Sequence, residues 1–128
     1  MGGVGREGKT GSKAIERVRR LCLALPETQE ALAWGHPVFK AGTKTFAAVE
    51  PVKGRPSIAF RLEPLDVDLL LTRRSFFVTP YGRGQWVSTW ADAALDWPLI
   101  TRLVERSYRV VALKRMLKTL DGAGPRPR

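Results

Sequence analysis

The segment AWGHPVFKAGTKTFA, residues 33–47, decides how the sequence is interpreted, because it combines a hairpin pattern with an unusual histidine. Two runs of strand-forming residues, 38–41 and 44–50, flank a turn at Gly42, as in a β-hairpin. His36 is the only histidine of the chain and precedes a proline, which favours extended backbone. The segment therefore predicts two antiparallel strands with His36 at the entrance to the first.

The rest of the chain supplies further strands and helices. Three more β-type runs are expected, at residues 57–62, 75–81 and 85–91. Three helices are expected, over residues 13–25, from Pro64 onward and over residues 97–120. Ser12 and Asp96 are candidate N-caps, and Pro26 stops the first helix.

These elements predict a single α+β domain over residues 13–120. We expect an antiparallel sheet of about five strands, with the N- and C-terminal helices packed on one face. Residues 1–12 and 121–128 are rich in glycine, proline and charge, so we expect two disordered tails.

The charge balance points to a polyanionic partner. Lysine and arginine total 22 against 12 acidic residues, and residues 14–120 alone carry 17 basic and 10 acidic side chains. Such an excess attracts DNA or another polyanion, although it can also serve solubility alone. The cations expected to contact phosphate form one row on each long helix, with one more at a turn: Lys13, Arg17, Arg20, Arg102, Arg106, Arg109 and Arg83.

Patterns for catalysis or metal binding are not evident. A catalytic histidine needs a nucleophile, an orienting carboxylate or metal co-ligands, so the lone His36 is interpreted as a structural loop residue. The acidic pairs Asp66/Asp68 and Asp92/Asp96 lie near helix starts, where carboxylates interact favourably with the helix dipole. We therefore predict a nonenzymatic protein with no cofactor and no metal site.

Cys22 is the only cysteine, so no internal disulfide can form. Its place on the apolar side of the first predicted helix favours a buried, inert thiol. No stretch has the length and apolarity of a membrane span or a signal peptide. These observations predict a cytoplasmic protein without membrane contact.

A competing hypothesis is a small-ligand binding protein or enzyme. Loops and strand ends often form pockets, and several polar and aromatic residues fall at such positions. The residues of this candidate pocket are Trp34, His36, Lys44, Tyr81 and Trp86. Nucleic-acid binding through the basic surface, with duplex DNA as the expected partner, is the leading hypothesis, and the pocket is the alternative. The sequence leaves open a homodimer through an exposed sheet face.

Six short motifs, in order, resemble the MmcQ/YjbR-like family of small bacterial proteins. They are LP (25–26), WGHPVF (34–39), GTKTFA (42–47), PY (80–81), WV (86–87) and SYRVVALKR (107–115). The resemblance covers about residues 14–118 and implies an α+β domain of CyaY-like type. It also implies a DNA-binding label, based on a proposed double-wing arrangement, and no defined reaction or cofactor. A frataxin-like iron role is not expected, because the first helix here is basic.

Overall fold

Six strands form one antiparallel sheet in the part of the chain that the computed structural model describes, residues 2–80 and 84–123. Their spatial order is β1-β2-β3-β4-β6-β5, and each neighbouring pair is antiparallel. The strands are β1 (Thr28–Ala33), β2 (His36–Ala41), β3 (Lys44–Val52), β4 (Arg55–Arg61), β5 (Phe76–Val78) and β6 (Trp86–Trp90). The hairpin predicted from residues 33–47 is β2–β3, and Gly42 turns it with a φ of 64°.

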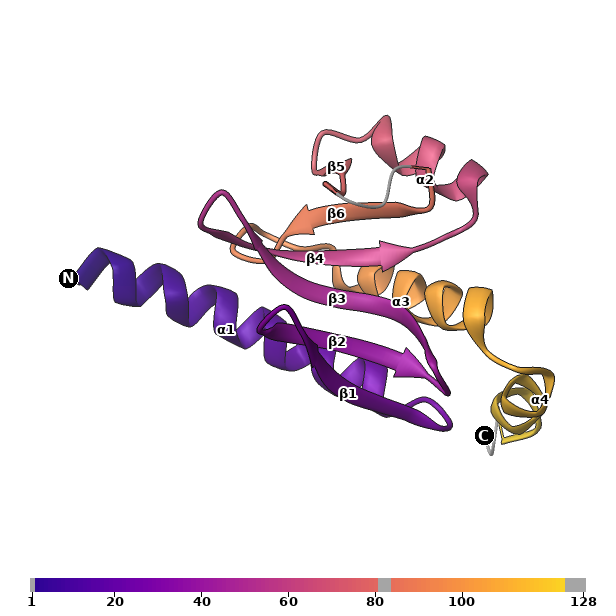
Figure 1. The fold of residues 1–128 in the computed structure, drawn as a ribbon. Helices are drawn as coiled ribbons and strands as arrows, with labels where there is room; N and C mark the ends of the chain where they lie inside the picture. The colour runs from indigo at the N-terminus through magenta and orange to yellow at the C-terminus, as the bar shows by residue number, and fades with distance from the viewer. Residues whose placement is uncertain (1, 81–83, 124–128) are drawn as a thin grey trace.

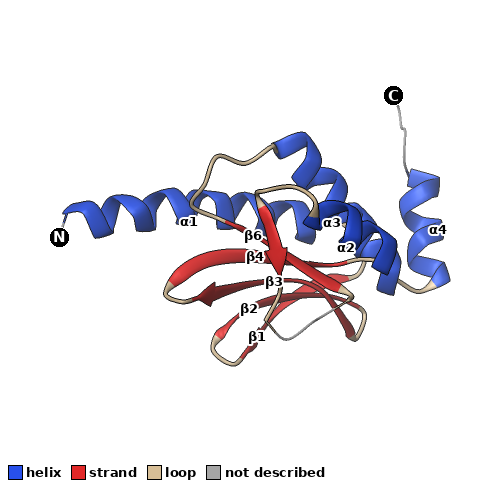
Figure 2. Cartoon of the chain, turned by 90° about the horizontal axis from the view of Figure 1, so that it is seen from above, coloured by secondary structure: helices blue, strands red, loops and turns tan. Residues whose placement is uncertain are grey.

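The helices of the described residues gather on one side of this sheet (Figures 1 and 2). They are α1 (Gly2–Leu23), α2 (Pro64–Leu71), α3 (Trp97–Val111) and α4 (Lys114–Ala123). Among the described residues, none of the helices combines the length and apolarity needed to cross a membrane. The α+β class predicted from the sequence, with the long helices on one face, is confirmed.

The main core lies between the helices and the sheet. Ile58, Phe60 and Leu62 share one face of β4 and its extension by the two-residue period, and each is at most 1% exposed. Phe46 of β3 and Tyr108 of α3 make an edge-to-face pair with ring centroids 5.7 Å apart. The Tyr108 hydroxyl also donates a hydrogen bond of 2.8 Å to the Pro26 carbonyl, so α3 is fixed both to the sheet and to the segment after α1.

β1 lies where the sequence predicted a loop before residue 38, and it brings the sheet to six strands, close to the predicted number of about five. The sequence of β1, TQEALA, contains no run of β-branched or aromatic residues, so its pattern does not predict a strand. Its conformation comes from pairing with β2 along its whole length, from Thr28 opposite Ala41 to Ala33 opposite His36.

The helix predicted over residues 97–120 is instead two helices. Asp96 caps α3 as expected, because its side chain accepts a hydrogen bond from the Leu99 amide. α3 ends at Val111, since Ala112 has extended backbone, and α4 then leaves in a new direction (Figure 1). The break places Met116 in the core with no exposed surface.

The ends of the domain also differ from the prediction. α1 begins at Gly2, so Ser12 lies inside the helix and residues 2–12 continue it where a disordered tail was expected. Extending a formed helix costs less than nucleating one, so a glycine-rich segment can be helical as the N-terminal part of α1. α4 continues to Ala123, and residues 124–128 lie outside the described residues.

Candidate ligand-binding groove

The sheet face opposite the helices carries a row of small side chains. The strand register aligns Val38 of β2 with Ala48 of β3, and Ala48 with Ala59 of β4. These three residues form a small buried cluster separate from the main core, and the indole of Trp86 packs against it. Because the side chains are short, the row forms a shallow apolar floor.

This floor belongs to an open groove with a volume of about 960 Å³. Residues of the β1–β2 and β3–β4 hairpin turns line this groove, together with residues 79–80 and Trp86. The Thr79 and Ser88 hydroxyls are hydrogen bonded at 2.7 Å, which fixes the end of β5 against β6. The volume lies in the range of small-molecule sites in proteins.

Both turns that border the groove place a long side chain on strained backbone. Trp34 has a φ of 55° and precedes Gly35 at 85°, and Lys53 has a φ of 54° and precedes Gly54 at 78°. Positive φ at both central residues is the requirement of the type I′ hairpin turn, which favours asparagine followed by glycine. A tryptophan there costs about 1–2 kcal/mol, and strain of this kind clusters at functional sites.

Trp34 is also almost fully exposed, at 96% of its surface. An indole is a large apolar group, so full exposure leaves surface that a ligand could cover. Exposure and strained backbone at one lining residue distinguish Trp34 from the other tryptophans. Trp90, for example, stacks on Phe77 with centroids 4.4 Å apart and has the Arg55 guanidinium over its ring.

A titratable pair lies beside the apolar floor. His36 Nε2 is 3.7 Å from Glu50 Oε1, and the two side chains are only 20% and 15% exposed. The separation is too long for a hydrogen bond, so both atoms keep their hydrogen-bonding capacity. His36 Nδ1 is buried and has no hydrogen-bond partner among the described residues. The groove therefore contains a partly desolvated donor and acceptor that are not satisfied by each other.

The structure brings together part of the pocket predicted from sequence. Trp34, His36 and Trp86 all line the groove. Lys44 does not line it, because it begins β3 at the end away from the β3–β4 turn. Tyr81 lies outside the described residues, although its neighbour Pro80 lines the groove.

Sequence reasoning missed the polar lining residues Glu50, Lys53 and Thr79. Glu50 could have been predicted as a lining residue, because the two-residue period of β3 puts it on the same face as Ala48. Lys53 could also have been predicted, since a residue before glycine in a two-residue turn projects from the tip of the hairpin.

Several of the cations predicted to contact phosphate are paired with acids. Arg106 pairs with Asp66 of α2 at 2.7 Å, and Arg109 pairs with Asp121 of α4 at 2.6 Å. The bond to Asp121 is the main cause that raises the pKa of Arg109. Arg102 makes no ion pair with a described residue, and Arg83 lies outside the described residues. The α3 row is therefore largely occupied by internal ion pairs.

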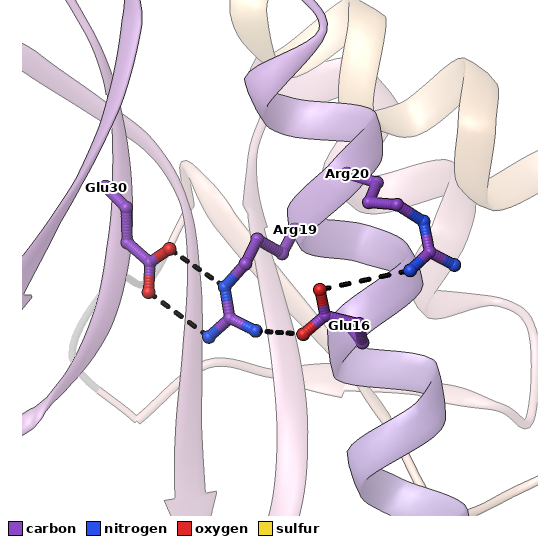
Figure 3. A network of polar contacts seen from close by, with 4 residues as sticks. All are labelled: Glu16, Arg19, Arg20 and Glu30. Atoms are coloured by element: carbon purple, nitrogen blue, oxygen red, sulfur yellow. Dashed lines mark hydrogen bonds and ion pairs between the residues drawn. The ribbon is translucent and has the colours of Figure 1, made fainter.

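The row on α1 is also interrupted by acid. Glu16 contacts both Arg19 and Arg20, and Arg19 reaches across to Glu30 of β1 at 2.8 Å (Figure 3). The hydrogen bond to Glu30 is the main cause that raises the pKa of Arg19. This network fastens α1 to the first strand of the sheet, and it includes Arg20 of the predicted row.

Lys13 and Arg17 remain available on α1. They line a second, smaller hollow of about 340 Å³ with Trp97, and the Arg17 guanidinium lies 4.2 Å from the centroid of the Trp97 ring. Neither cation makes an ion pair with a described acid. Within the described residues, no group of three or more His, Cys, Asp or Glu side chains is placed to hold a metal ion.

The fold and the groove together define a small two-layer α+β domain with an uncovered sheet face. The family model YjbR matches residues 23–110, which is more than half of the sequence, and the chain belongs to the YjbR family. The match covers the sheet, α2 and nearly all of α3. A comparison with curated proteins finds no significant match.

Solved structures share the fold. The Deinococcus radiodurans protein DR2400, described as a DUF419 domain, is 20% identical, with a TM-score of 0.68 over 84% of this chain and 87% of its own. A protein from Pseudomonas syringae is 16% identical, with a TM-score of 0.60 over 66% of this chain and 87% of its own. At these identities the likeness concerns the fold alone.

Proposed function

We propose that this protein is a nonenzymatic binding protein that holds a small, flat organic ligand in the groove on the bare face of its sheet. The observation that carries the proposal is the composition of the groove, an apolar floor with a few polar groups at one side. Sites for small molecules have this composition, because apolar surface supplies affinity and a few polar groups supply orientation.

His36 and Glu50 are better suited to binding a ligand than to catalysing a reaction. A general base needs a nucleophile or a substrate proton within hydrogen-bond reach, and a nucleophile needs its own activating base. Among the described residues that line the groove, Glu50 is the charged group that faces His36 within 4 Å. The pair therefore supports a role in orienting a ligand.

A cytoplasmic location belongs to the same proposal. It is supported by Cys22, which is the only cysteine of the chain and is fully buried as a free thiol.

Nucleic-acid binding is a second candidate, favoured by one feature of the helical side. Lys13 and Arg17 lie beside Trp97 without an acidic partner among the described residues, in a protein of net charge +10. Such cations attract phosphate through a field that falls with salt. This surface lies on α1, whereas the groove lies on the opposite face of the sheet, so the two sites can be tested separately.

A neutral fluorescent probe, N-phenyl-1-naphthylamine, tests the groove. It carries no charge, so the basic surface does not attract it. We expect saturable fluorescence enhancement with the wild type and an affinity at least about fivefold lower for Trp34→Ala, since an aromatic contact contributes about 1 kcal/mol. Leu65→Ala is the control, because Leu65 is 70% exposed on α2, outside the groove.

Absence of probe binding would contradict the proposal, and so would two further outcomes. One is probe binding that Trp34→Ala and Leu65→Ala affect equally. The other is a stable dimer in sedimentation equilibrium that Trp34→Ala converts to monomer, because the groove would then be an interface between copies of the chain.

A further inference from the structure

We propose that the groove selects a planar nitrogen heterocycle with an N–H donor beside a ring acceptor, the chemistry of a nucleobase edge. The inference rests on the proposed function of the groove and specifies its ligand. It follows from the shape of the floor, the aromatic lining, the unsatisfied pair His36 and Glu50, and the charge at the rim.

The floor and lining favour a flat aromatic ring. Val38, Ala48 and Ala59 are short and lie in register on three strands, so a planar group can lie against them. Trp34 and Trp86 both line the space above the floor. Indole faces stack on heteroaromatic rings, and stacking of this kind tolerates any ring with a π-face.

His36 and Glu50 add a requirement for hydrogen bonding. An ionised carboxylate only accepts hydrogen bonds, and an imidazole with a proton on Nε2 donates there. A heterocycle with an N–H group beside a ring nitrogen or carbonyl satisfies both atoms, because Glu50 accepts from the N–H and His36 donates to the acceptor. Proteins read bases in the same way, with carboxylates accepting from amino groups.

Partial burial converts this match into selectivity. The two side chains are 20% and 15% exposed, and their nearest atoms are 3.7 Å apart, so neither satisfies the other. A ring without the N–H group would cover Glu50 without pairing it, and an unpaired buried acceptor weakens binding. The groove should therefore reject planar rings that lack the donor.

Lys53 places a positive charge at the rim of the same groove. It lies at the tip of the β3–β4 turn, where an ammonium can reach a charged substituent of a bound ring. A phosphate carried by the heterocycle would meet this charge. The same base edge is available from a free nucleotide and from an unpaired base of single-stranded nucleic acid.

Binding of adenosine and N6,N6-dimethyladenosine to the full-length wild type tests the requirement for a donor. The two ligands share the ring and the acceptor, but the dimethyl compound lacks the N–H. We expect adenosine to bind about tenfold more tightly, the ratio that one hydrogen bond to a charged group supplies. Glu50→Leu should remove this ratio, while Glu105→Gln, on the exposed face of α3, should keep it.

Further ligands separate the possible sources of the base. Adenosine monophosphate should bind about threefold more tightly than adenosine, and Lys53→Gln should remove this gain, since an exposed ion pair contributes little more. Binding of the monophosphate supports a free nucleotide as the source. If a single-stranded oligoadenylate binds much more tightly than the monophosphate, an unpaired base is the source, and the N–H requirement is still tested by the two nucleosides.

The neutral probe distinguishes failure of this inference from failure of the groove. If the probe binds in a Trp34-dependent manner but adenosine and its dimethyl analogue bind equally or not at all, the inference is overturned and the groove proposal stands. If the probe also fails to bind, both are overturned. The wild-type comparison needs no variant, so a folding defect in Glu50→Leu cannot obscure the result.

Discussion

Trp34 and Lys53 occupy equivalent positions in two hairpin turns that border the same groove. Each has a φ near 55° and is followed by a glycine of positive φ. A turn selected for stability alone would have asparagine at this position. Both residues therefore keep a strained backbone, and in return a long side chain is held at the border of the groove. This relationship supports a role for the groove beyond packing.

Trp34→Asn should stabilise the protein and weaken binding at the same time. Asparagine tolerates left-handed backbone, so we expect the free energy of unfolding to rise by about 0.5–1 kcal/mol in urea titrations. Affinity for N-phenyl-1-naphthylamine should fall, because the indole is lost. Lys53→Asn should give a similar gain in stability, because Lys53 has nearly the same φ, and Leu65→Ala outside the groove is the control for probe affinity. A loss of stability in Trp34→Asn would contradict the strain argument.

The Cys22 thiol should be unreactive in the folded protein. Burial raises its pKa to about 12, so the nucleophilic thiolate is scarce at pH 8. Alkylation by iodoacetamide, followed by mass spectrometry, should be at least about a hundredfold slower than in 6 M guanidinium chloride. Equal rates in the two conditions would show that Cys22 is accessible.

The raised pKa also predicts how stability depends on pH. In the unfolded chain the thiol ionises near pH 8.5, whereas the folded state holds its proton until the pH approaches 12. The unfolded state therefore binds fewer protons in this window, and the free energy of unfolding falls as pH rises. Cys22→Val should remove this component of the slope between pH 8.5 and 10. An unchanged slope would contradict it.

Gly42→Ala should destabilise the β2–β3 turn. Gly42 has a φ of 64°, and a Cβ there would lie 2.9 Å from Met116 Cε. We expect a loss of about 1–2 kcal/mol by urea titration, mostly from the strained backbone, because the methionine end can shift. Gly122→Ala is the control: it lies in α4 with nothing within 4 Å of its Cβ and should be neutral or stabilising.

Binding of a labelled DNA duplex should depend more on cations without an acidic partner than on cations in ion pairs. Combined substitution of Lys13→Gln and Arg17→Gln should lower affinity at low salt and reduce the log–log salt slope by about two, if each cation neutralises one phosphate. Combined Arg106→Gln and Arg109→Gln removes the same charge from ion-paired positions and should change the slope less. Absence of binding at low salt, or equal effects of the two double variants, would contradict a nucleic-acid role for the α1 hollow.

Much of the fold could be predicted from local pattern. The β2–β3 hairpin, β4 and the cap of α3 at Asp96 follow from strand-forming runs, a turn glycine and a capping residue. β1 could not be predicted, because pairing with β2 rather than its own sequence makes it a strand. The break between α3 and α4 at Ala112 could not be predicted either, since the sequence has no glycine or proline there. The burial of Met116 depends on tertiary packing, which local sequence does not show.

The candidate site was predictable only in part. Trp34, His36 and Trp86 were identified as pocket residues because they fall at loops and strand ends, and the structure places all three in one groove. The basic rows were predicted from helical spacing alone, and the acids that pair with them come from distant segments, such as Asp66 for Arg106 and Asp121 for Arg109. Spacing along one helix does not reveal partners contributed by another.

The most direct test of the groove is to map the neutral probe by amide chemical shifts in two-dimensional NMR. Titration with N-phenyl-1-naphthylamine should shift the amides of Val38, Ala48 and Ala59 on the bare sheet face, together with those of the Trp34 turn. Amides on the outer face of α3 should remain unchanged. Shifts that are absent, or that fall mainly on the helices, would contradict the assignment of this groove as the binding site.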